Sequence, residues 1–184
     1  QTATQIIADI RAGALKPSDL MAVTLDQIAA ENPRVNAIVS LRDADALMEQ
    51  AHVADQASPT GPLHGLPMAV KDLANVAGLP TSMGSPLFAG TVAETSDIMV
   101  KRLQDAGAII IGKTNTPAFG LGSHTTNPVF GPTENALTPG KSAGGSSGGA
   151  AVALATQRGG LLGGRLGPLA AVSARDRDQQ YHRQ

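Results

Sequence analysis

Apolar side chains recur at intervals of three and four residues in four parts of the chain, which is the spacing of a helix with one buried face. We predict helices there, with these residues on their buried faces: Ile6, Ile7 and Ile10; Met21, Leu25 and Ile28; Ala44, Leu47, Met48 and Ala51; Met99, Leu103 and Ala106. Pro17-Ser18 is typical of a helix start. Asn32-Pro33 predicts the end of the second helix, because a residue that precedes proline disfavours helical dihedrals.

Short, continuously apolar runs alternate with these helices. Residues 37–41 and 108–112 are predicted to be buried strands, and residues 66–72 a third strand that ends in two charged residues. Because a helix leads directly into the strand at 108–112, we expect parallel pairing and an α/β fold, a mixed β-sheet flanked by helices. Residues 114–141 are rich in proline and glycine and are predicted to be mostly loop.

Composition narrows the classes of function. The 184 residues include 14 basic and 15 acidic side chains, a balance that argues against a nucleic-acid surface. The absence of cysteine excludes disulfides and thiolate metal sites, and the four histidines lack the spacing of metal ligands, so we expect no metal. No apolar run is long enough to cross a bilayer, so we expect no membrane partner. Only 2% of the residues are aromatic, so the core must consist of alanine, valine, isoleucine and leucine.

The stretch Gly144-Gly145-Ser146-Ser147-Gly148-Gly149 places two adjacent serines between glycines, just before an apolar run. A glycine-rich turn that leads into a helix directs free backbone N–H groups at whatever lies there. One alternative is a flexible serine–glycine linker, but the run is short and apolar sequence flanks it. Another is a phosphate-binding loop at Gly140-Lys141-Ser142, but that motif needs a glycine where this chain has Asn135.

Lys71 is the second candidate for chemistry, because it ends an apolar strand. Burial of a lysine disfavours its charged form, and a neutral lysine amine can act as the base that activates a serine. The alternative is a solvated lysine at the strand end, paired with Asp72. A glycine-framed serine elsewhere in the chain favours the catalytic interpretation over the structural one.

Four segments, in the same order, resemble the amidase signature family. Pro67-Met68-Ala69-Val70-Lys71-Asp72, with residues 76–85, resembles the lysine segment of that family; residues 111–117 and 127–131 resemble its central segments, and residues 144–149 the start of its serine- and glycine-rich signature. The resemblance covers about residues 3–156. Members of the family are usually several hundred residues long, so the resemblance implies that only the N-terminal part of the fold is present.

The resemblance implies a Ser–Ser–Lys triad that hydrolyses the C–N bond of a carboxamide through an acyl-enzyme, with no metal or cofactor. Lys71 matches the base and Ser146 the bridging serine, which in the family follows a cis peptide bond. Ser147 matches a neighbour with a structural or hydrogen-bonding role, and Gly122 and Ser123 match residues that line the substrate pocket. The resemblance also implies a small-molecule amide as partner, a cytoplasmic location and a homodimer as one form of assembly.

The family's nucleophilic serine has no counterpart in this chain. It is expected about two dozen residues after the bridging serine, where an ungapped count reaches Ala170. Ser173 is the only serine after Ser147, and Pro168 lacks a backbone N–H nearby. We therefore expect an amidase-signature domain over residues 1–156 and a divergent tail without order over residues 157–184. Two alternatives remain: an inactive, truncated or frame-altered amidase fragment, and the glutaminase-type subunit of a tRNA-dependent amidotransferase.

Overall fold

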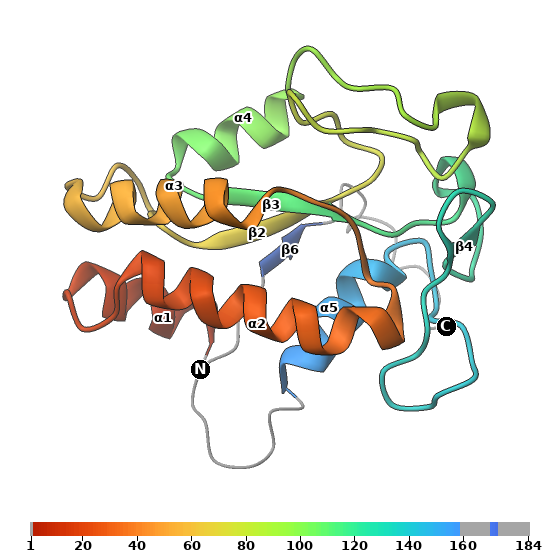
Figure 1. The fold of residues 1–184 in the computed structure, drawn as a ribbon, viewed down its shortest axis with the longest axis horizontal. Coiled ribbons are helices and arrows are strands. Elements are labelled where there is room, and N and C mark those ends of the chain that lie inside the picture. Colours follow the sequence, from red (N-terminus) through yellow and green to blue (C-terminus); the bar gives the residue numbers. More distant parts are fainter. Residues whose placement is uncertain (1, 159–169, 173–184) are drawn as a thin grey trace, which may run out of the picture.

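A mixed β-sheet with flanking helices forms the centre of the protein, as predicted (Figure 1). The computed structural model describes residues 2–158 and 170–172. Four strands lie in the order β1-β3-β2-β6, with these bounds: β1 Ile38–Leu41, β2 Pro67–Lys71, β3 Ile109–Thr114 and β6 Ala170–Val172. Strand β2 runs parallel to both β3 and β6, and β1 runs antiparallel to β3.

The five α-helices of the described residues include all four that the periodicity predicts, and one that follows the glycine-rich stretch. Their bounds are α1 Ala3–Arg11, α2 Pro17–Val35, α3 Ala44–Gln56, α4 Ile98–Asp105 and α5 Gly148–Arg158. The loops between them hold two short 3-10 turns, η1 Pro86–Phe88 and η2 Ala118–Gly120, and a two-stranded ladder of β4 Thr126–Asn127 with β5 Gly131–Pro132. In Figure 1, α4 lies above the strands, and α2 and α5 lie below them.

Helix α2 does not end at Asn32-Pro33, so that prediction is wrong. Pro33 lies within the helix, which continues to Val35 and closes at Asn36 in the left-handed conformation (φ 51°). The side chain of Asn32 explains the continuation, because its Oδ1 accepts hydrogen bonds from the N–H groups of Ala37 and Ile38 at 2.9 and 2.8 Å. These bonds fasten the helix end to the start of β1 through a turn of five to six residues, which a rule for the Asn-Pro dipeptide does not contain.

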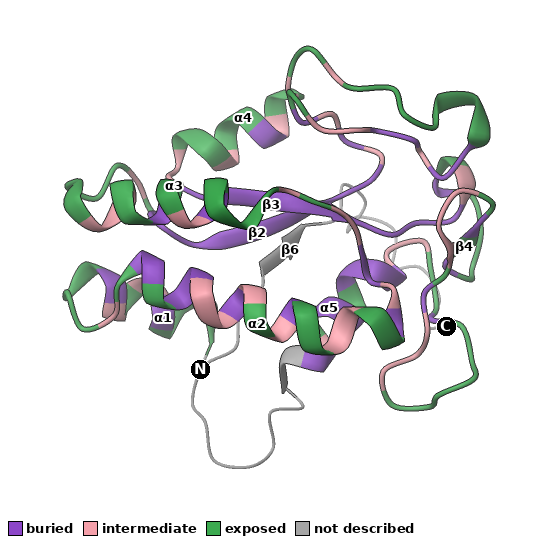
Figure 2. Cartoon of the chain, viewed as in Figure 1, coloured by how far each residue is buried: buried purple, intermediate pink, exposed green. Residues whose placement is uncertain are grey.

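Two hydrophobic clusters pack against the two faces of the sheet. One joins strand residues such as Ala69 and Ile111 to α2, α3 and α5, and the other joins Val70 and Ile110 to α1 and α4. Figure 2 shows that β2 and β3 are buried along their whole length. Strand β1 is less buried than predicted, because it is an edge strand and Leu41 at its end is exposed.

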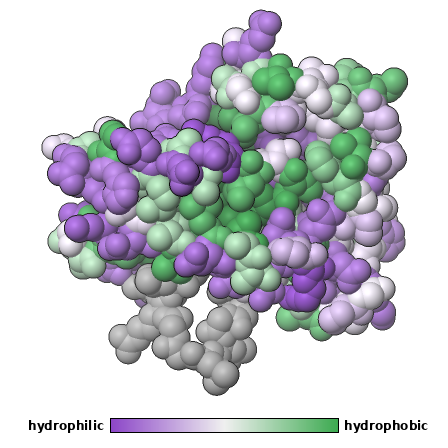
Figure 3. Space-filling view, viewed as in Figure 1, coloured by the Kyte–Doolittle hydropathy of each residue, from purple (hydrophilic) through white to green (hydrophobic). Residues whose placement is uncertain are grey.

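Several large apolar side chains are exposed in the described part of the chain, and hydrophobic residues gather in the middle of the face seen in Figure 3. The most exposed, each at least 55% accessible, are Val53, Leu87, Val92, Ile98, Leu121 and Leu137. The sequence does not predict strand β6, which lies within the tail that we expected to be without order. Apart from β6 and the last two residues of α5, that tail lies outside the described residues.

A shift in strand pairing decides which side chains share a face at the end of β3. The register of β2 against β3 changes part-way along, and beyond the change Lys71 lies opposite Thr114. Gly112 occupies the irregular stretch, where an added Cβ would contact the backbone oxygen of Ser40 and lie 3.0 Å from Cα of Leu41. Only glycine fits this close approach of β1 and β3, and it sets the faces of the residues that follow it.

Candidate active site

Lys71, the last residue of β2, is 1% exposed and its amine reaches the serine pair at the start of α5. Its Nζ lies 2.7 Å from Oγ of Ser146 and 3.3 Å from Oγ of Ser147. The predicted hydrogen-bond contact between Lys71 and Ser146 is therefore present, and the alternative of a solvated lysine is wrong. At such a distance a neutral amine can accept the hydroxyl proton of Ser146 as well as donate to its oxygen.

The serine loop is held by threonines from two neighbouring segments. The peptide bond between Gly145 and Ser146 is cis, as predicted. Thr116 Oγ1 donates to the carbonyl of Ser146 at 3.2 Å, and Thr125 Oγ1 donates to the carbonyl of Gly144 at 2.9 Å. The hydroxyl of Thr125 also accepts from the N–H of Gly148 at 3.0 Å, so one of the free N–H groups at the start of α5 has a partner.

Glycine at position 149 allows this loop to approach the sheet. An added Cβ there would contact the backbone N of Asn115 and lie 2.6 Å from its carbonyl oxygen and 2.8 Å from the carbonyl oxygen of Ala37. These atoms belong to backbone at the ends of β3 and β1, which cannot rotate away as a side chain can. The close packing of α5 on the sheet brings Ser146 to Lys71.

Gly122 and Ser123 lie beside the serine loop, and both are exposed. The carbonyl oxygen of Ser123 accepts from the N–H of Gly145 at 2.7 Å. Gly122 has φ 146°, a conformation that L side chains rarely adopt, and an added Cβ on Gly145 would lie 3.1 Å from its carbonyl oxygen. The structure thus gathers all five predicted site residues at one edge of the sheet, although their roles stay predictions.

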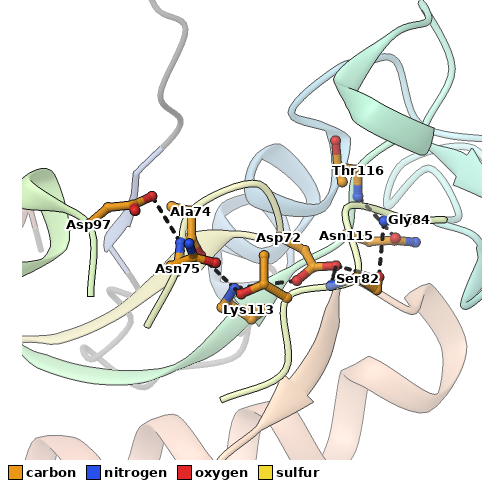
Figure 4. A network of polar contacts seen from close by, with 10 residues as sticks. Asp72, Ala74, Asn75, Ser82, Gly84, Asp97, Lys113, Asn115 and Thr116 are labelled. Carbon is orange, nitrogen blue, oxygen red and sulfur yellow. Dashed lines mark hydrogen bonds and ion pairs between the residues drawn. The ribbon is translucent and has the colours of Figure 1, made fainter. Parts of the chain in front are cut away.

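Sequence reasoning missed a buried ion pair on the other face of β2 (Figure 4). The amine of Lys113, 0% exposed, lies 3.4 Å from Oδ1 of Asp72, which is 1% exposed. Asp72 Oδ2 accepts from the hydroxyl of Ser82 at 2.7 Å, so Asp72 is bound by Lys113 and Ser82. Burial lowers the pKa of Lys113, and the charge of Asp72 opposes part of that effect.

A second polar network, also missed, holds the loop that follows β3. The amide of Asn127 donates to Oδ1 of Asn115 and to the carbonyl of Thr116, both at 2.7 Å, and its own Oδ1 accepts from the N–H groups of Val129 and Phe130. Asn127 therefore ties the turn at 127–130 to the segment after β3 that contains Asn115 and Thr116. The one sequence signal for it is the presence of several polar residues directly after a buried strand.

Among the described residues, no group of histidine, aspartate or glutamate side chains is arranged to hold a metal ion. His64 is buried and bonds the carbonyl of Ala54 at 3.0 Å, a structural arrangement. None of the described helices is long and apolar enough to cross a membrane. Ala170, where a nucleophilic serine is expected, lies in β6 opposite Met68, whereas Pro168 and Ser173 lie outside the described residues.

A sequence model of one protein family, described as Amidase, matches residues 19–162. That range covers most of the chain and includes Lys71, Ser146 and Ser147. The chain therefore belongs to the amidase family, whose members include the amidase signature enzymes.

Two curated relatives differ in the activities that their names give. The chain is 40% identical over 178 residues to an acylamidase of Rhodococcus erythropolis, and 38% identical over 159 residues to the A subunit of the glutamyl-tRNA(Gln) amidotransferase of Acidothermus cellulolyticus. These alignments cover 94% and 84% of this chain but 35% and 31% of the relatives, so the chain spans about a third of their length. An alignment that includes 94% of the chain extends past Thr156, into the stretch that we expected to diverge.

Solved structures agree with the fold. A peptide amidase from Stenotrophomonas maltophilia superimposes with a TM-score of 0.75 at 33% identity, covering 84% of this chain and 34% of that one. A bacterial aryl acylamidase of the amidase signature family superimposes with a TM-score of 0.77 at 29% identity, covering 84% of this chain and 33% of that one. Both proteins are named as amidases, and in both cases the likeness is to about a third of the larger protein.

Proposed function

We propose that this chain carries the proton-relay half of an amidase site, in which Lys71 is the base and Ser146 the bridging serine. The observation that carries the proposal is the 2.7 Å contact between Lys71 Nζ and Ser146 Oγ at a buried strand end. The substrate would be a small-molecule carboxamide. A nucleophilic serine would lose its proton to Ser146 while Ser146 passes its own to Lys71, and the resulting alkoxide would attack the carbonyl carbon.

The geometry supports this sequence of proton transfers in two ways. Lys71 is removed from water, and loss of solvation disfavours the ammonium form that could not accept a proton. The carbonyl of Ser146 is fastened by Thr116 and the N–H of Gly145 by Ser123, so the hydroxyl is held at one place before the reaction begins. The amine returns its proton through Ser146 to the leaving nitrogen, and water then releases the acid from the acyl-enzyme.

The chain as written is proposed to be inactive by itself, because it offers alanine at the position expected for the nucleophile. Hydrolysis of an aryl amide such as 4-nitroacetanilide by the purified chain is expected to stay at the buffer rate. The matched variant is Ser173→Ala. Clear turnover that this substitution abolishes would make Ser173 the nucleophile and contradict the proposal that the nucleophile is missing.

A hybrid protein tests the relay itself. In the hybrid, the later segment of the Rhodococcus erythropolis acylamidase replaces residues 157–184 and supplies the missing part of the site. We expect it to hydrolyse the aryl amide, and Lys71→Ala or Ser146→Ala to lower kcat by several orders of magnitude. The control is Lys101→Ala, which removes an exposed lysine of α4. A folded, active hybrid that keeps its rate after Lys71→Ala would refute the role of Lys71.

The glutaminase-type subunit of a tRNA-dependent amidotransferase is the second candidate, favoured by the 38% identity to one component of such an enzyme. The same hybrid distinguishes the two when it is given L-glutamine beside the aryl amide. Release of ammonia from glutamine at a much higher kcat/KM than anilide cleavage would favour the glutaminase function.

A further inference from the structure

Two buried lysines and one buried carboxylate meet at the same end of the sheet. Lys71 is 1% exposed, Lys113 is 0% exposed, and Asp72, the direct neighbour of Lys71, is 1% exposed. A buried carboxylate strongly attracts a buried lysine. The structure gives the carboxylate to Lys113, which leaves the proposed base on the other side of the sheet.

The shift in strand pairing produces this separation. Beyond the shift, Lys113 lies opposite Val70, whereas Lys71 lies opposite Thr114. Residues that lie opposite each other share a face, and successive residues alternate. Lys71 therefore faces the serine loop, and Lys113 shares the opposite face with Val70, where the side chain of Asp72 also lies.

Three acceptors surround Nζ of Lys113, which matches the three hydrogens of a lysine ammonium. Besides Asp72, its Nζ donates to the carbonyl of Ala74 at 2.6 Å and to Oγ1 of Thr81 at 2.9 Å. Asp72 is held from its other side by the N–H and the hydroxyl of Ser82. Figure 4 shows Lys113 between Asp72 and Ala74. Asp97, whose carboxylate accepts from the N–H of Asn75 at 3.0 Å, lies farther from Lys113, and its negative charge acts to raise the pKa of Lys113.

We propose that Lys113 is a positioning residue for the amidase reaction: it holds the carboxylate of Asp72 on the face away from Lys71 and cancels its charge. The inference rests on the proposed role of Lys71 as the base. Without Lys113, an uncompensated carboxylate would remain one residue away from Lys71 and would stabilise its ammonium form. An ammonium has no lone pair, so it could not take the proton of Ser146.

Protonation of each lysine amine in the purified chain can be followed by NMR of protein labelled with 13C and 15N in lysine, at the Cε and Nζ atoms. The signal of Lys71 is assigned by its loss in Lys71→Met. In Lys113→Met we expect the protonation midpoint of Lys71 to move to higher pH, with about a tenfold rise in proton affinity. In Asp72→Asn the charge of Lys113 is left uncompensated, and the midpoint of Lys71 should move to lower pH.

The double variant Asp72→Asn/Lys113→Met removes both charges and should return the midpoint close to that of the unaltered chain. The control Lys101→Met, on the exposed side of α4, should leave it unchanged. If Asp72 and Lys113 form a merely structural pair, the two single variants should move the protonation midpoint of Lys71 in the same direction or not at all. Either result would overturn the proposal. If Lys113→Met does not fold, the opposite shift in Asp72→Asn decides. The titration needs no enzyme activity, so its outcome is independent of the hybrid test of Lys71.

Discussion

Replacing Gly149 by alanine tests whether the serine pair is placed by the close packing of α5 on the sheet. The added Cβ would lie 2.6 Å from the carbonyl oxygen of Asn115 and 2.8 Å from that of Ala37, and would also contact the backbone N of Asn115. All three are backbone atoms. Relief of the overlap requires the start of α5 to move outward, away from the ends of β3 and β1.

The expected cost follows from two opposing effects. Overpacking of a well-packed site costs about 1–3 kcal/mol, and rigid backbone on the other side favours the upper end. Alanine is better than glycine within a helix by about 1 kcal/mol, which offsets part of that cost. We therefore expect Gly149→Ala to lower the free energy of unfolding by about 2 kcal/mol. The outward movement should also lengthen the contact between Lys71 and Ser146.

Urea unfolding followed by far-ultraviolet circular dichroism measures the stability change. The matched control is Gly144→Ala, in the same loop, where the nearest atom to an added Cβ is the carbonyl oxygen of Ser123 at 4.0 Å. That variant should stay within about 0.5 kcal/mol of the unaltered chain. Equal stability of Gly149→Ala and Gly144→Ala would refute the claim that the approach of α5 to the sheet requires glycine at 149.

Two further predictions concern buried polar groups. Burial raises the pKa of Asp55, but its hydrogen bonds from Ser18 and its contact with His52 outweigh that effect, so the pKa lies below the ordinary value. The carboxylate of Asp55 therefore stabilises the fold above its unfolded-state pKa, and this stabilisation is lost as the pH falls through its folded-state pKa. In urea titrations, the difference in unfolding free energy between the unaltered chain and Asp55→Asn should shrink below about pH 4. A difference that does not change with pH would contradict this. The hydroxyl of Thr114 is buried with no hydrogen-bond partner in the described part of the chain, so Thr114→Val should raise the unfolding free energy by about 1 kcal/mol, whereas Thr116→Val, which removes a bonded hydroxyl, should lower it by about 1 kcal/mol.

The site was accessible to sequence reasoning only in part. Lys71 and Ser146 are 75 residues apart in the chain, and no local pattern says that their side chains meet. The resemblance to the amidase signature family supplied that pairing, and the structure places the two atoms in contact. Lys113 carried no such signal, because a lysine at the end of an apolar strand has the same local pattern whether it bonds a serine or a carboxylate.

Four of the five α-helices and the strands β1, β2 and β3 were determined by the sequence itself, because the spacing of apolar residues is a local property that any burial of one face must respect. The end of α2, the faces of the two lysines and the pairing of β6 with β2 were decided by tertiary structure. In each case a contact joins residues far apart in the chain: the amide of Asn36, which closes α2, donates to the carbonyls of Phe130 and Pro132, and Gly112 lets β1 approach β3. Such contacts depend on the distance between backbones, and a pattern along one segment does not contain that distance.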